Sequence, residues 1–306
     1  MISVVVPTEQ LRDRLLGRLP DARLSVWRPG SAGAFPGPAD LLVLPYMIPA
    51  AELRRLHGLP IRAIQSQTLG YDGVGDHLPA GMVYCNAVAV HEGSTAELAL
   101  ALILAQLRGI PAAVRDADRA AWSHRRHPGL AGRRVLLLGA GGVGREVIRR
   151  LAPFGAMLDV VARSERAGVR GLASLPDLLP RADVVILAVP LTGSTRKLVD
   201  AAFLAAMQEG ALLVNVSRGG IVDTDALVEA VREGRIRAAL DVTEPEPLPG
   251  DHPLWSLPGV LITPHLGGDT DEMDVRVDEL IAEQVARLGR GEQPANIVLV
   301  GAPPEL

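Results

Sequence analysis

The sequence contains only one cysteine and one lysine. Because Cys85 is the sole cysteine among 306 residues, no disulfide can form within the chain. The first residues carry no signal-peptide pattern, and together with the lone cysteine this predicts a reducing, cytoplasmic location. Lys197 is the only lysine, so arginine supplies almost all of the basic charge.

A large charge of one sign and long hydrophobic runs are also absent. The formal net charge of −4 gives no electrostatic reason to expect nucleic acid or an acidic membrane as a partner. The longest apolar run, Leu98 to Leu107, covers about half of a membrane span and predicts a buried helix instead. With 48% hydrophobic and 22% charged residues, the chain is typical of a soluble globular protein with room for two domains.

Apolar segments of strand length alternate with helical patterns along most of the chain. In the first part, strands are expected at 2–6, 40–44, 61–64 and 82–84, and helices at 9–19 and 50–57. Further on, strands are expected at 135–138, 158–162, 184–188, 212–216, 238–240 and 261–263, and helices at 143–151 and 223–232. This alternation predicts an α/β protein whose parallel sheets are covered on both faces.

Two long helices divide the chain. The segment from Glu92 to Arg108, with Ser94 or Thr95 as its expected cap, is apolar nearly all round and should be buried between domains or subunits. The amphipathic segment from Asp271 to Leu288 ends at Gly289, and a short strand from Ile297 to Val300 follows. We therefore predict a discontinuous substrate domain formed by 1–91 and 271–306, with a dinucleotide-binding domain, 92–270, inserted between its two parts.

A glycine motif lies between a predicted strand and a predicted helix. Gly139, Gly141 and Gly144 have GxGxxG spacing directly after the strand that ends at Leu138. The first glycine permits a tight turn, the second lets the backbone approach a pyrophosphate, and the third lets the helix pack close to its strand. The amides and the positive dipole end of that helix would then face the phosphates. This pattern predicts a dinucleotide site.

The residues after the second strand bear on which dinucleotide is bound. An NAD site usually has Asp or Glu about 20 residues past the motif to hold the ribose hydroxyls, whereas this chain has Ala162, Arg163 and Ser164. Arginine can pair with a 2′-phosphate and serine can donate a hydrogen bond to it, so NADP is favoured. The alternative is an NAD site without its acid beside a solvated arginine, and Glu165 is close enough to keep NAD possible.

Three polar residues follow later strands of the middle domain. Arg218 lies in NVSRGGIVD, Glu246 in DVTEPEP and His265 in TPHLGG. Each alone has an ordinary explanation as a surface, loop or turn residue. Ligands of open α/β sheets bind at the carboxyl ends of the strands, however, which is where all three are expected.

Together with a nicotinamide, these three residues meet the needs of 2-keto acid reduction. The developing alkoxide requires a proton from an acid that works near neutral pH, and histidine suits this task. A carboxylate beside that histidine favours its charged form and fixes the ring. The substrate carboxylate and the carbonyl need a permanently charged donor with fork geometry, as arginine provides. No metal is expected.

The chain resembles the D-isomer-specific 2-hydroxyacid dehydrogenases from about Ile61 to His265. The motifs that carry the resemblance are LGYDGVGD, GAGGVG, AVPLTGSTRKLVD, NVSRGGIVDTDAL, DVTEPEPLP and TPHLGG. The resemblance implies a Rossmann-type nucleotide-binding domain inserted in a flavodoxin-like substrate domain, and a homodimer to which the helix from Glu92 to Arg108 contributes.

The resemblance also implies roles for individual residues. Arg218 would bind the keto acid, Glu246 would pair with His265, and His265 would be the proton donor. The backbone amides of Leu69 and Gly70 would hold the substrate carboxylate. Asp241 would orient the nicotinamide carboxamide, and the remaining cofactor contacts would come from Gly142, Val143, Val189, Pro190, Thr195, Ser217 and Gly267, besides the glycine motif, Arg163 and Ser164.

Two departures from the family pattern refine the substrate and the cofactor. Ala162 and Arg163 replace the usual acid, as in the NADPH-using glyoxylate and hydroxypyruvate reductases of the family. The loop LPYMIPAAEL is apolar where phosphoglycerate dehydrogenases tend to have an arginine, which argues for a small or apolar keto acid such as glyoxylate or hydroxypyruvate. The alternatives are a nucleotide-sensing protein like the corepressors of the family, or a dehydrogenase for phosphoglycerate or formate.

Overall fold

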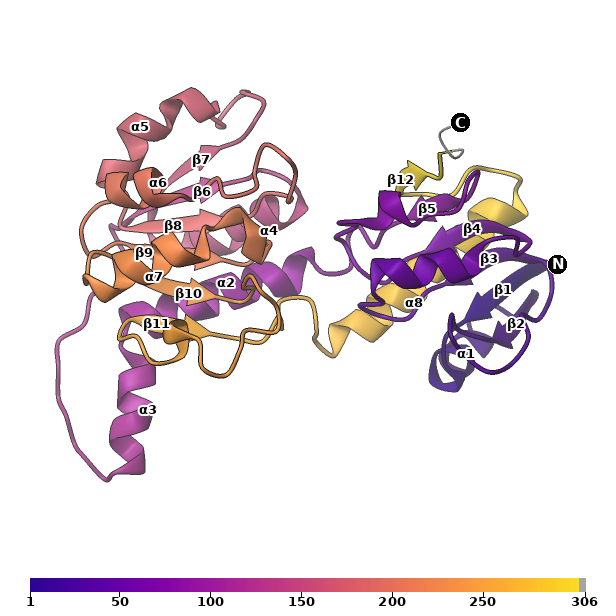
Figure 1. The fold of residues 1–306 in the computed structure, drawn as a ribbon, viewed down its shortest axis with the longest axis horizontal. Helices are drawn as coiled ribbons and strands as arrows, with labels where there is room; N and C mark the ends of the chain where they lie inside the picture. The colour runs from indigo at the N-terminus through magenta and orange to yellow at the C-terminus, as the bar shows by residue number, and fades with distance from the viewer. Residues whose placement is uncertain (303–306) are drawn as a thin grey trace. The chain divides into compact units, whose positions relative to one another are not determined.

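The chain forms two compact units, each built around its own sheet. In the computed structural model, which describes residues 1–302, unit 1 comprises Met1–His91 and Asp271–Leu306, and unit 2 comprises Glu92–Thr270. The last four residues of the predicted segment 271–306 lie outside the described residues. Figure 1 shows the ribbon of the chain with its helices and strands labelled.

Unit 1 contains a six-stranded sheet in the order β12-β5-β4-β3-β1-β2. Its strands are β1 (Ile2–Val6), β2 (Ala22–Val26), β3 (Ala39–Val43), β4 (Ile61–Gln65), β5 (Val83–Cys85) and β12 (Ile297–Val300), and its helices are α1 (Glu9–Leu16) and α8 (Glu272–Gly289). β1 to β5 are parallel in flavodoxin-like order, whereas β12 runs antiparallel to β5.

Alternate residues of the unit 1 strands face two separate cores. Val4 and Val6 pack with Leu15 of α1 and Ile281 of α8. Val5 points to the opposite core, which also contains Leu53 from the 3₁₀ helix Ala50–Leu56. The side chains of neighbouring strand residues point to opposite faces, so this sheet is covered on both sides.

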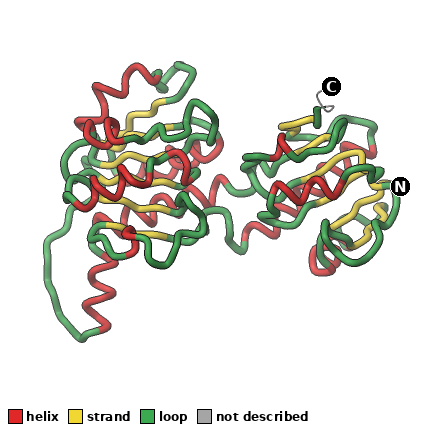
Figure 2. The backbone as a smooth tube through the Cα atoms, viewed as in Figure 1, coloured by secondary structure: helices red, strands yellow, loops and turns green. Residues whose placement is uncertain are grey.

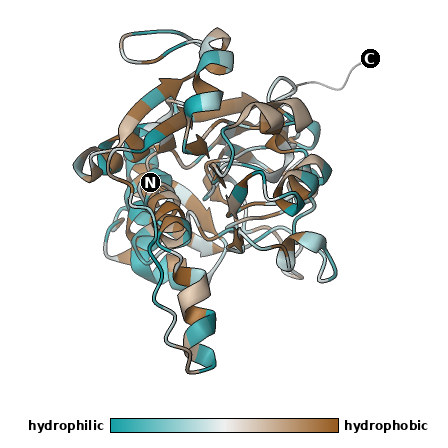
Figure 3. Ribbon diagram, turned by 90° about the vertical axis from the view of Figure 1, so that its left-hand side faces the viewer, coloured by the Kyte–Doolittle hydropathy of each residue, from teal (hydrophilic) through white to brown (hydrophobic). Residues whose placement is uncertain are grey.

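Unit 2 contains six parallel strands in the order β11-β10-β9-β8-β6-β7. The strands are β6 (Arg134–Leu138), β7 (Met157–Val161), β8 (Val184–Leu187), β9 (Leu212–Asn215), β10 (Arg237–Leu240) and β11 (Val260–Ile262). The helices are α2 (Glu92–Leu107), α3 (Ile110–Asp118), α4 (Gly142–Leu151), α5 (Leu175–Leu178), α6 (Ala201–Ala206) and α7 (Thr224–Arg232). Most residues of these strands are buried. They are also apolar, and Figure 3 colours apolar residues brown.

The strand order of unit 2 is that of a Rossmann fold in which the third strand is reduced to a single bridge. Where that strand would lie beside β7, only a single parallel bridge joins Val161 and Arg170. The chain order reverses at β6, whose two neighbours are β7 and β8. Ligands of such sheets bind at the carboxyl end of this switch point. The predicted α/β class and Rossmann-type domain are confirmed.

Several predicted elements differ in their details. The cap at Ser94 or Thr95 is wrong, because α2 already begins at Glu92 and both residues lie inside it. The helix expected at 9–19 ends at Leu16, before Gly17, and the helix expected at 50–57 is a 3₁₀ helix. The sheet of the first domain is parallel from β1 to β5, as predicted, and β12 adds one antiparallel strand at its edge. The sequence pattern did not indicate β2 or α3.

Helix α3 and the loop after it stand apart from the rest of unit 2, as Figures 1, 2 and 3 all show. We call residues 110–127 the arm. Its loop returns to its starting point, because the ring of His127 occupies the space where a Cβ on Gly109 would stand. Ile110 is 50% exposed, Val114 is 56% exposed and Trp122 is 97% exposed. The arm therefore presents apolar side chains to solvent.

No single helix within residues 1–302 is long and apolar enough to cross a membrane. The pair α2 and α3, bent by 65° where they meet, passes by length and composition only when the two are counted together.

Candidate active site

The three predicted catalytic residues follow three neighbouring strands of unit 2. Arg218 comes after β9, Glu246 after β10 and His265 after β11. These strands are adjacent and parallel, so the loops at their carboxyl ends share one edge of the sheet. The structure thus brings together residues that are far apart in the sequence.

His265 and Glu246 form a hydrogen-bonded pair. Nδ1 of His265 lies 2.5 Å from Oε1 of Glu246, and the two side chains are 27% and 37% exposed. Partial burial by itself would raise the pKa of Glu246. The hydrogen bond and charge of His265, a backbone hydrogen bond at Thr243 and the charge of Arg218 outweigh burial and hold this pKa below its usual value. Glu246 is therefore ionised at neutral pH and accepts the Nδ1 proton of His265.

The backbone of His265 is held in an unusual conformation by Asp241. His265 has φ 55°, a left-handed value that non-glycine residues seldom adopt. Its N–H donates to the Asp241 carbonyl at 2.8 Å. The buried Asp241 carboxylate accepts from Leu266 N at 2.8 Å, Gly267 N at 2.9 Å and Thr263 Oγ1 at 2.6 Å. Such strain persists only where surrounding contacts fix it, and it is commonest at functional sites.

Gly267 is needed for this arrangement. A Cβ at this position would lie 2.9 Å from Oδ2 of Asp241 and 3.4 Å from the side chain of Thr95. Thr95, on α2, thus closes the side of the His265 turn, a role that the sequence pattern did not indicate. The predicted contact of Asp241 with the nicotinamide and that of Gly267 with the cofactor stay predictions. The contacts observed for both residues stabilise the His265 loop.

Glycines bring the Arg218 loop against the Glu246 loop. A Cβ on Gly219 would collide with the Thr243 carbonyl, and one on Gly220 with the Glu244 carboxylate. The Glu246 loop is braced further by Arg196, whose Nη1 lies 3.0 Å from Glu244 Oε1. The RGG sequence therefore allows close approach, and the charge of Arg218 reaches Glu246.

Arg218 itself is half-buried and oriented by its neighbours. Its Nη1 donates to the Ser217 carbonyl at 2.7 Å, and its own carbonyl accepts from Asn215 Nδ2 at 2.9 Å. Asn215 Oδ1 also accepts from the Ser217 hydroxyl at 2.8 Å. The buried Asn215 at the end of β9 thus fixes the peptide backbone that carries the guanidinium.

The glycine motif has the geometry that its spacing predicts. Gly139 has φ 111°, and a Cβ there would collide with the Ala188 carbonyl after β8. A Cβ on Gly144 would collide with the Gly139 carbonyl, so the third glycine permits close packing of α4 on its strand. Gly141 is exposed, and a Cβ there would meet no atom within 4 Å. The open space at Gly141, beside the N-terminus of α4, fits the pyrophosphate of a dinucleotide.

The two other predicted residues of this turn have contacts within unit 2. A Cβ on Gly142 would lie 2.6 Å from Cγ of Glu92, so this glycine permits α4 to pack on α2. Val143 is partly buried against the core between α2 and the sheet. Both residues belong to the first turn of α4, whose backbone amides remain available to a phosphate.

Arg163 and Ser164 follow β7, as the sequence pattern predicts, and both are exposed. Glu165 is exposed, and its Oε2 lies 3.5 Å from where a Cβ on Gly171 would stand. Arg166, which the sequence analysis did not single out, donates from Nη2 to the Ala140 carbonyl of the glycine turn at 3.0 Å. The only feature of the sequence that could have pointed to Arg166 was its position three residues after Arg163.

The remaining predicted residues lie in two loops. Val189 and Pro190 follow β8, where Thr195 Oγ1 donates to the Pro190 carbonyl at 2.6 Å and closes the loop. Leu69 and Gly70 follow β4 in unit 1. Asn86 Nδ2 donates to the Leu69 carbonyl at 2.7 Å and thereby fixes the direction of the Gly70 amide, which shares that peptide plane.

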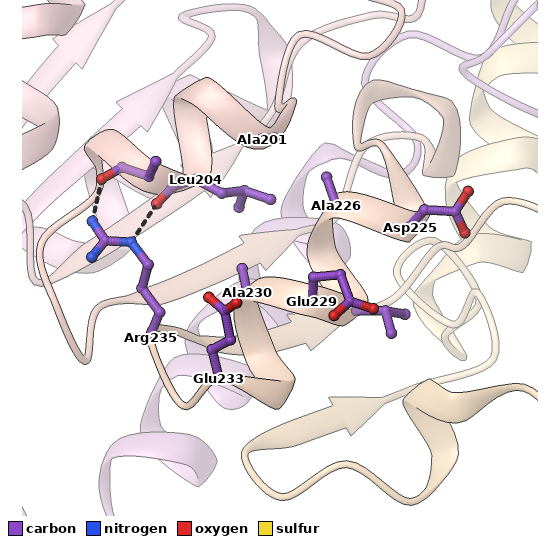
Figure 4. A pocket seen from close by; sticks show the side chains of 10 residues that line it. Ala201, Leu204, Asp225, Ala226, Glu229, Ala230, Glu233 and Arg235 are labelled. Carbon is purple, nitrogen blue, oxygen red and sulfur yellow. Dashed lines mark hydrogen bonds between the residues drawn. The ribbon is translucent and has the colours of Figure 1, made fainter.

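A groove between α6 and α7 lies outside this set of residues (Figure 4). Its volume is about 490 Å³, with an apolar floor that includes Leu204 and Ala226 and a rim that carries Asp225, Glu229 and Glu233. None of its lining residues belongs to the candidate site. Within residues 1–302, no group of His, Cys, Asp or Glu side chains could hold a metal ion.

Comparisons with known proteins agree with the geometry. Residues 100–267 match the family model of the D-isomer specific 2-hydroxyacid dehydrogenase, NAD binding domain. The chain is 36% identical over 255 residues to a D-3-phosphoglycerate dehydrogenase of Methanocaldococcus jannaschii, a match that covers 78% of this chain and 48% of that protein. The chain therefore spans about half the length of this relative.

Two further relatives match over most of their length. A glyoxylate reductase of Korarchaeum cryptofilum is 34% identical over 252 residues, which cover 78% of this chain and 76% of that protein. The crystal structure of a D-isomer specific 2-hydroxyacid dehydrogenase from Xanthobacter autotrophicus Py2, in complex with NADPH and MES, has a TM-score of 0.82 at 28% identity, covering 97% of this chain and 98% of that one. The resemblance expected from the motifs is confirmed, and the chain belongs to the D-isomer specific 2-hydroxyacid dehydrogenase family.

Proposed function

We propose that this protein reduces a small 2-keto acid to the D-2-hydroxy acid with NADPH. The observation that carries the proposal is the hydrogen bond between His265 Nδ1 and Glu246, formed beside Arg218 at the edge of the sheet where the glycine motif also lies. An imidazole held by an ionised carboxylate next to a guanidinium provides the acid and the anion-binding group that keto acid reduction requires.

Each residue of the site has a defined task. Glu246 holds Nδ1 of His265, which leaves Nε2 to donate a proton to the substrate oxygen. Arg218 binds the substrate carboxylate and polarises the carbonyl. By family resemblance, we assign the backbone amides of Leu69 and Gly70 to the same carboxylate. A bound nicotinamide would supply the hydride, held by the glycine turn and by the loops of Val189, Pro190 and Thr195.

The segment after β7 supports NADP as the preferred cofactor. Ala162 stands where an acid would repel a 2′-phosphate, and Arg163 and Ser164 are exposed donors next to it. Glu165, the acid that could have favoured NAD, has its carboxylate beside Gly171. The solved relative from Xanthobacter autotrophicus holds NADPH.

The first-domain loop supports a small substrate such as glyoxylate or hydroxypyruvate. Residues 44–53, LPYMIPAAEL, contain no basic side chain that could pair with a phosphate on the substrate. One relative with comparable length is a glyoxylate reductase. We propose that the protein acts as a homodimer in the cytoplasm.

An assay of a dozen 2-keto acids against NADPH and NADH tests the proposal. We expect NADPH oxidation with glyoxylate or hydroxypyruvate, and much slower oxidation of NADH. Arg218→Ala and Glu246→Gln should slow turnover while NADPH binding, followed by fluorescence, remains measurable. Nucleotide binding without turnover of any keto acid would instead indicate a nucleotide-sensing protein.

A further inference from the structure

The loop between Ala162 and Arg170 replaces the third strand of the Rossmann sheet and carries three arginines. Its two ends are joined by hydrogen bonds from Ala162 N to Arg170 O at 2.9 Å and from Arg170 N to Val160 O at 2.8 Å. A tight turn closes its tip, where Arg166 and Val169 exchange backbone hydrogen bonds at 3.0 and 2.8 Å. The stretch with Arg163 and Ser164 is therefore one limb of a narrow loop.

Arg166 connects this loop to the glycine turn. Its Nη2 donates to the Ala140 carbonyl at 3.0 Å, and its Nη1 lies 3.4 Å from the Ser164 carbonyl of its own loop. The glycine turn is fixed at the other side by Gly139 N, which donates to Val161 O at the end of β7 at 2.8 Å. One planar guanidinium thus bridges the two segments that flank the adenosine end of a dinucleotide site.

The arginines of the loop differ in how their charge is balanced. Arg170 pairs with Asp159 at 3.3 Å. Within residues 1–302, by contrast, no carboxylate forms an ion pair with Arg163 or Arg166, and the side-chain hydrogen bonds of Arg166 go to the neutral carbonyl oxygens of Ala140 and Ser164. Two uncompensated guanidinium groups near the glycine turn favour an additional anionic group there.

We propose that Arg166 is a positioning residue for NADP specificity. By bridging Ala140 and Ser164, it holds the Arg163–Ser164 limb against the glycine turn so that these two residues can contact a 2′-phosphate. The inference rests on the proposed preference for NADP. Arg166 acts through Arg163, and this distinguishes it from a second cation that binds the phosphate independently.

A double-mutant cycle measured by calorimetric titration of NADP⁺ and NAD⁺ tests this role. We expect Arg163→Ala to weaken NADP⁺ binding about tenfold or more and Arg166→Ala about fivefold, with little change for NAD⁺. The double variant should bind NADP⁺ about as weakly as Arg163→Ala alone, because Arg166 has no further effect once Arg163 is gone. Arg166→Lys keeps the charge but cannot bridge two carbonyls with one planar group, so binding should stay weakened.

The controls separate the inference from the proposed function. Arg170→Ala, in the same loop but paired with Asp159, should leave the NADP⁺ to NAD⁺ affinity ratio unchanged. If the unmodified protein binds NADP⁺ no more tightly than NAD⁺, the proposed cofactor preference is wrong. If it does prefer NADP⁺, then unchanged affinity in Arg166→Ala, full rescue by Arg166→Lys or additive losses in the double variant would overturn the positioning role alone.

Discussion

At the level of single residues, the pair formed by Glu246 and His265 makes part of the folding stability depend on pH. The pKa of Glu246 lies below its usual value in the folded protein, mainly because the hydrogen bond and charge of His265 outweigh the opposing effect of burial. A lowered carboxyl pKa stabilises the folded state above the usual range of glutamate, and this contribution is lost as the pH falls through the folded pKa.

We therefore predict that Glu246→Gln destabilises the protein at neutral pH but not in acid. The loss in the free energy of unfolding should be about 0.5 kcal/mol at pH 7, since the side chain is 37% exposed and solvent screens the pair. Urea denaturation at several pH values would measure it. The difference from the unmodified protein should shrink towards zero as the pH falls below the usual glutamate range.

Glu209→Gln is a suitable control, because Glu209 is exposed in the turn before β9. Its effect on stability should be small at every pH in the series. A Glu246→Gln effect that grew as the pH decreased would contradict the assigned ionisation.

The residues of the site were predictable where sequence position determines spatial position. Arg218, Glu246 and His265 each follow a strand, and parallel neighbouring strands place their carboxyl ends at one edge. Arg166 could not be found in this way, because its partner Ala140 belongs to a separate turn and backbone carbonyls carry no sequence signal. The same holds for Thr95 beside Gly267 and for Arg196 beside Glu244.

At the level of elements, the glycines of the turn between β6 and α4 have two different roles. Gly144 permits close packing, whereas Gly141 leaves space for a ligand. Gly144 is buried against the Gly139 carbonyl, whereas Gly141 is exposed to open space with an ordinary φ of −77°. Identical substitutions at the two positions should therefore have opposite consequences.

We predict that Gly144→Ala destabilises unit 2 by about 1–3 kcal/mol, because the added methyl group forces α4 away from its strand. Gly141→Ala should change stability by less than about 0.5 kcal/mol and yet weaken NADP⁺ binding, because the methyl group occupies the approach of the pyrophosphate. Thermal denaturation and calorimetric titration of both variants would provide the comparison. Unimpaired nucleotide binding by Gly141→Ala would place the phosphates elsewhere.

Strands and helices were predictable where burial is complete. The parallel strands β6, β8 and β9 appear as short apolar runs because both of their faces are covered. β2 was missed because it lies at an edge and is only partly buried. The cap of α2 was misplaced because Ser94 and Thr95 resemble capping residues, although the helix begins two residues earlier, at Glu92.

At the level of the whole molecule, the arm formed by residues 110–127 is the segment that we propose to mediate self-association. It exposes Ile110, Val114 and Trp122, and its base is fixed by His127 against Gly109. A group of exposed apolar side chains on one protruding segment, rather than any single one of them, makes the arm a candidate interface.

We predict that the protein is a dimer and that Trp122→Ser weakens it. Size-exclusion chromatography with light scattering should show about twice the mass of 32.3 kDa for the unmodified protein and a shift towards the monomer for the variant. Leu16→Ser, an exposed position on α1 of unit 1, serves as the control and should remain dimeric. A monomeric unmodified protein, or an unaffected Trp122→Ser, would contradict a role of the arm in the dimer.

The sequence indicates less about the substrate than about the reaction, because the family motifs are densest in unit 2 and the first 60 residues match weakly. The three proposed catalytic residues all belong to unit 2, where most of the family motifs lie. Residues 44–53 of unit 1, which we propose to contact the substrate side chain, contain no basic residue that could pair with a phosphate, and this alone does not select one keto acid. The reported relatives differ in their named substrates, since one is a D-3-phosphoglycerate dehydrogenase and another a glyoxylate reductase.

The most direct test of the account is the turnover of glyoxylate with NADPH by His265→Asn. Asparagine has a similar size but cannot donate a proton as an imidazolium does. We predict that kcat falls about 100-fold or more, while the dissociation constant of NADPH stays within about twofold of that of the unmodified protein. Unchanged turnover in a variant that binds NADPH normally would contradict the assignment of His265 as the proton donor.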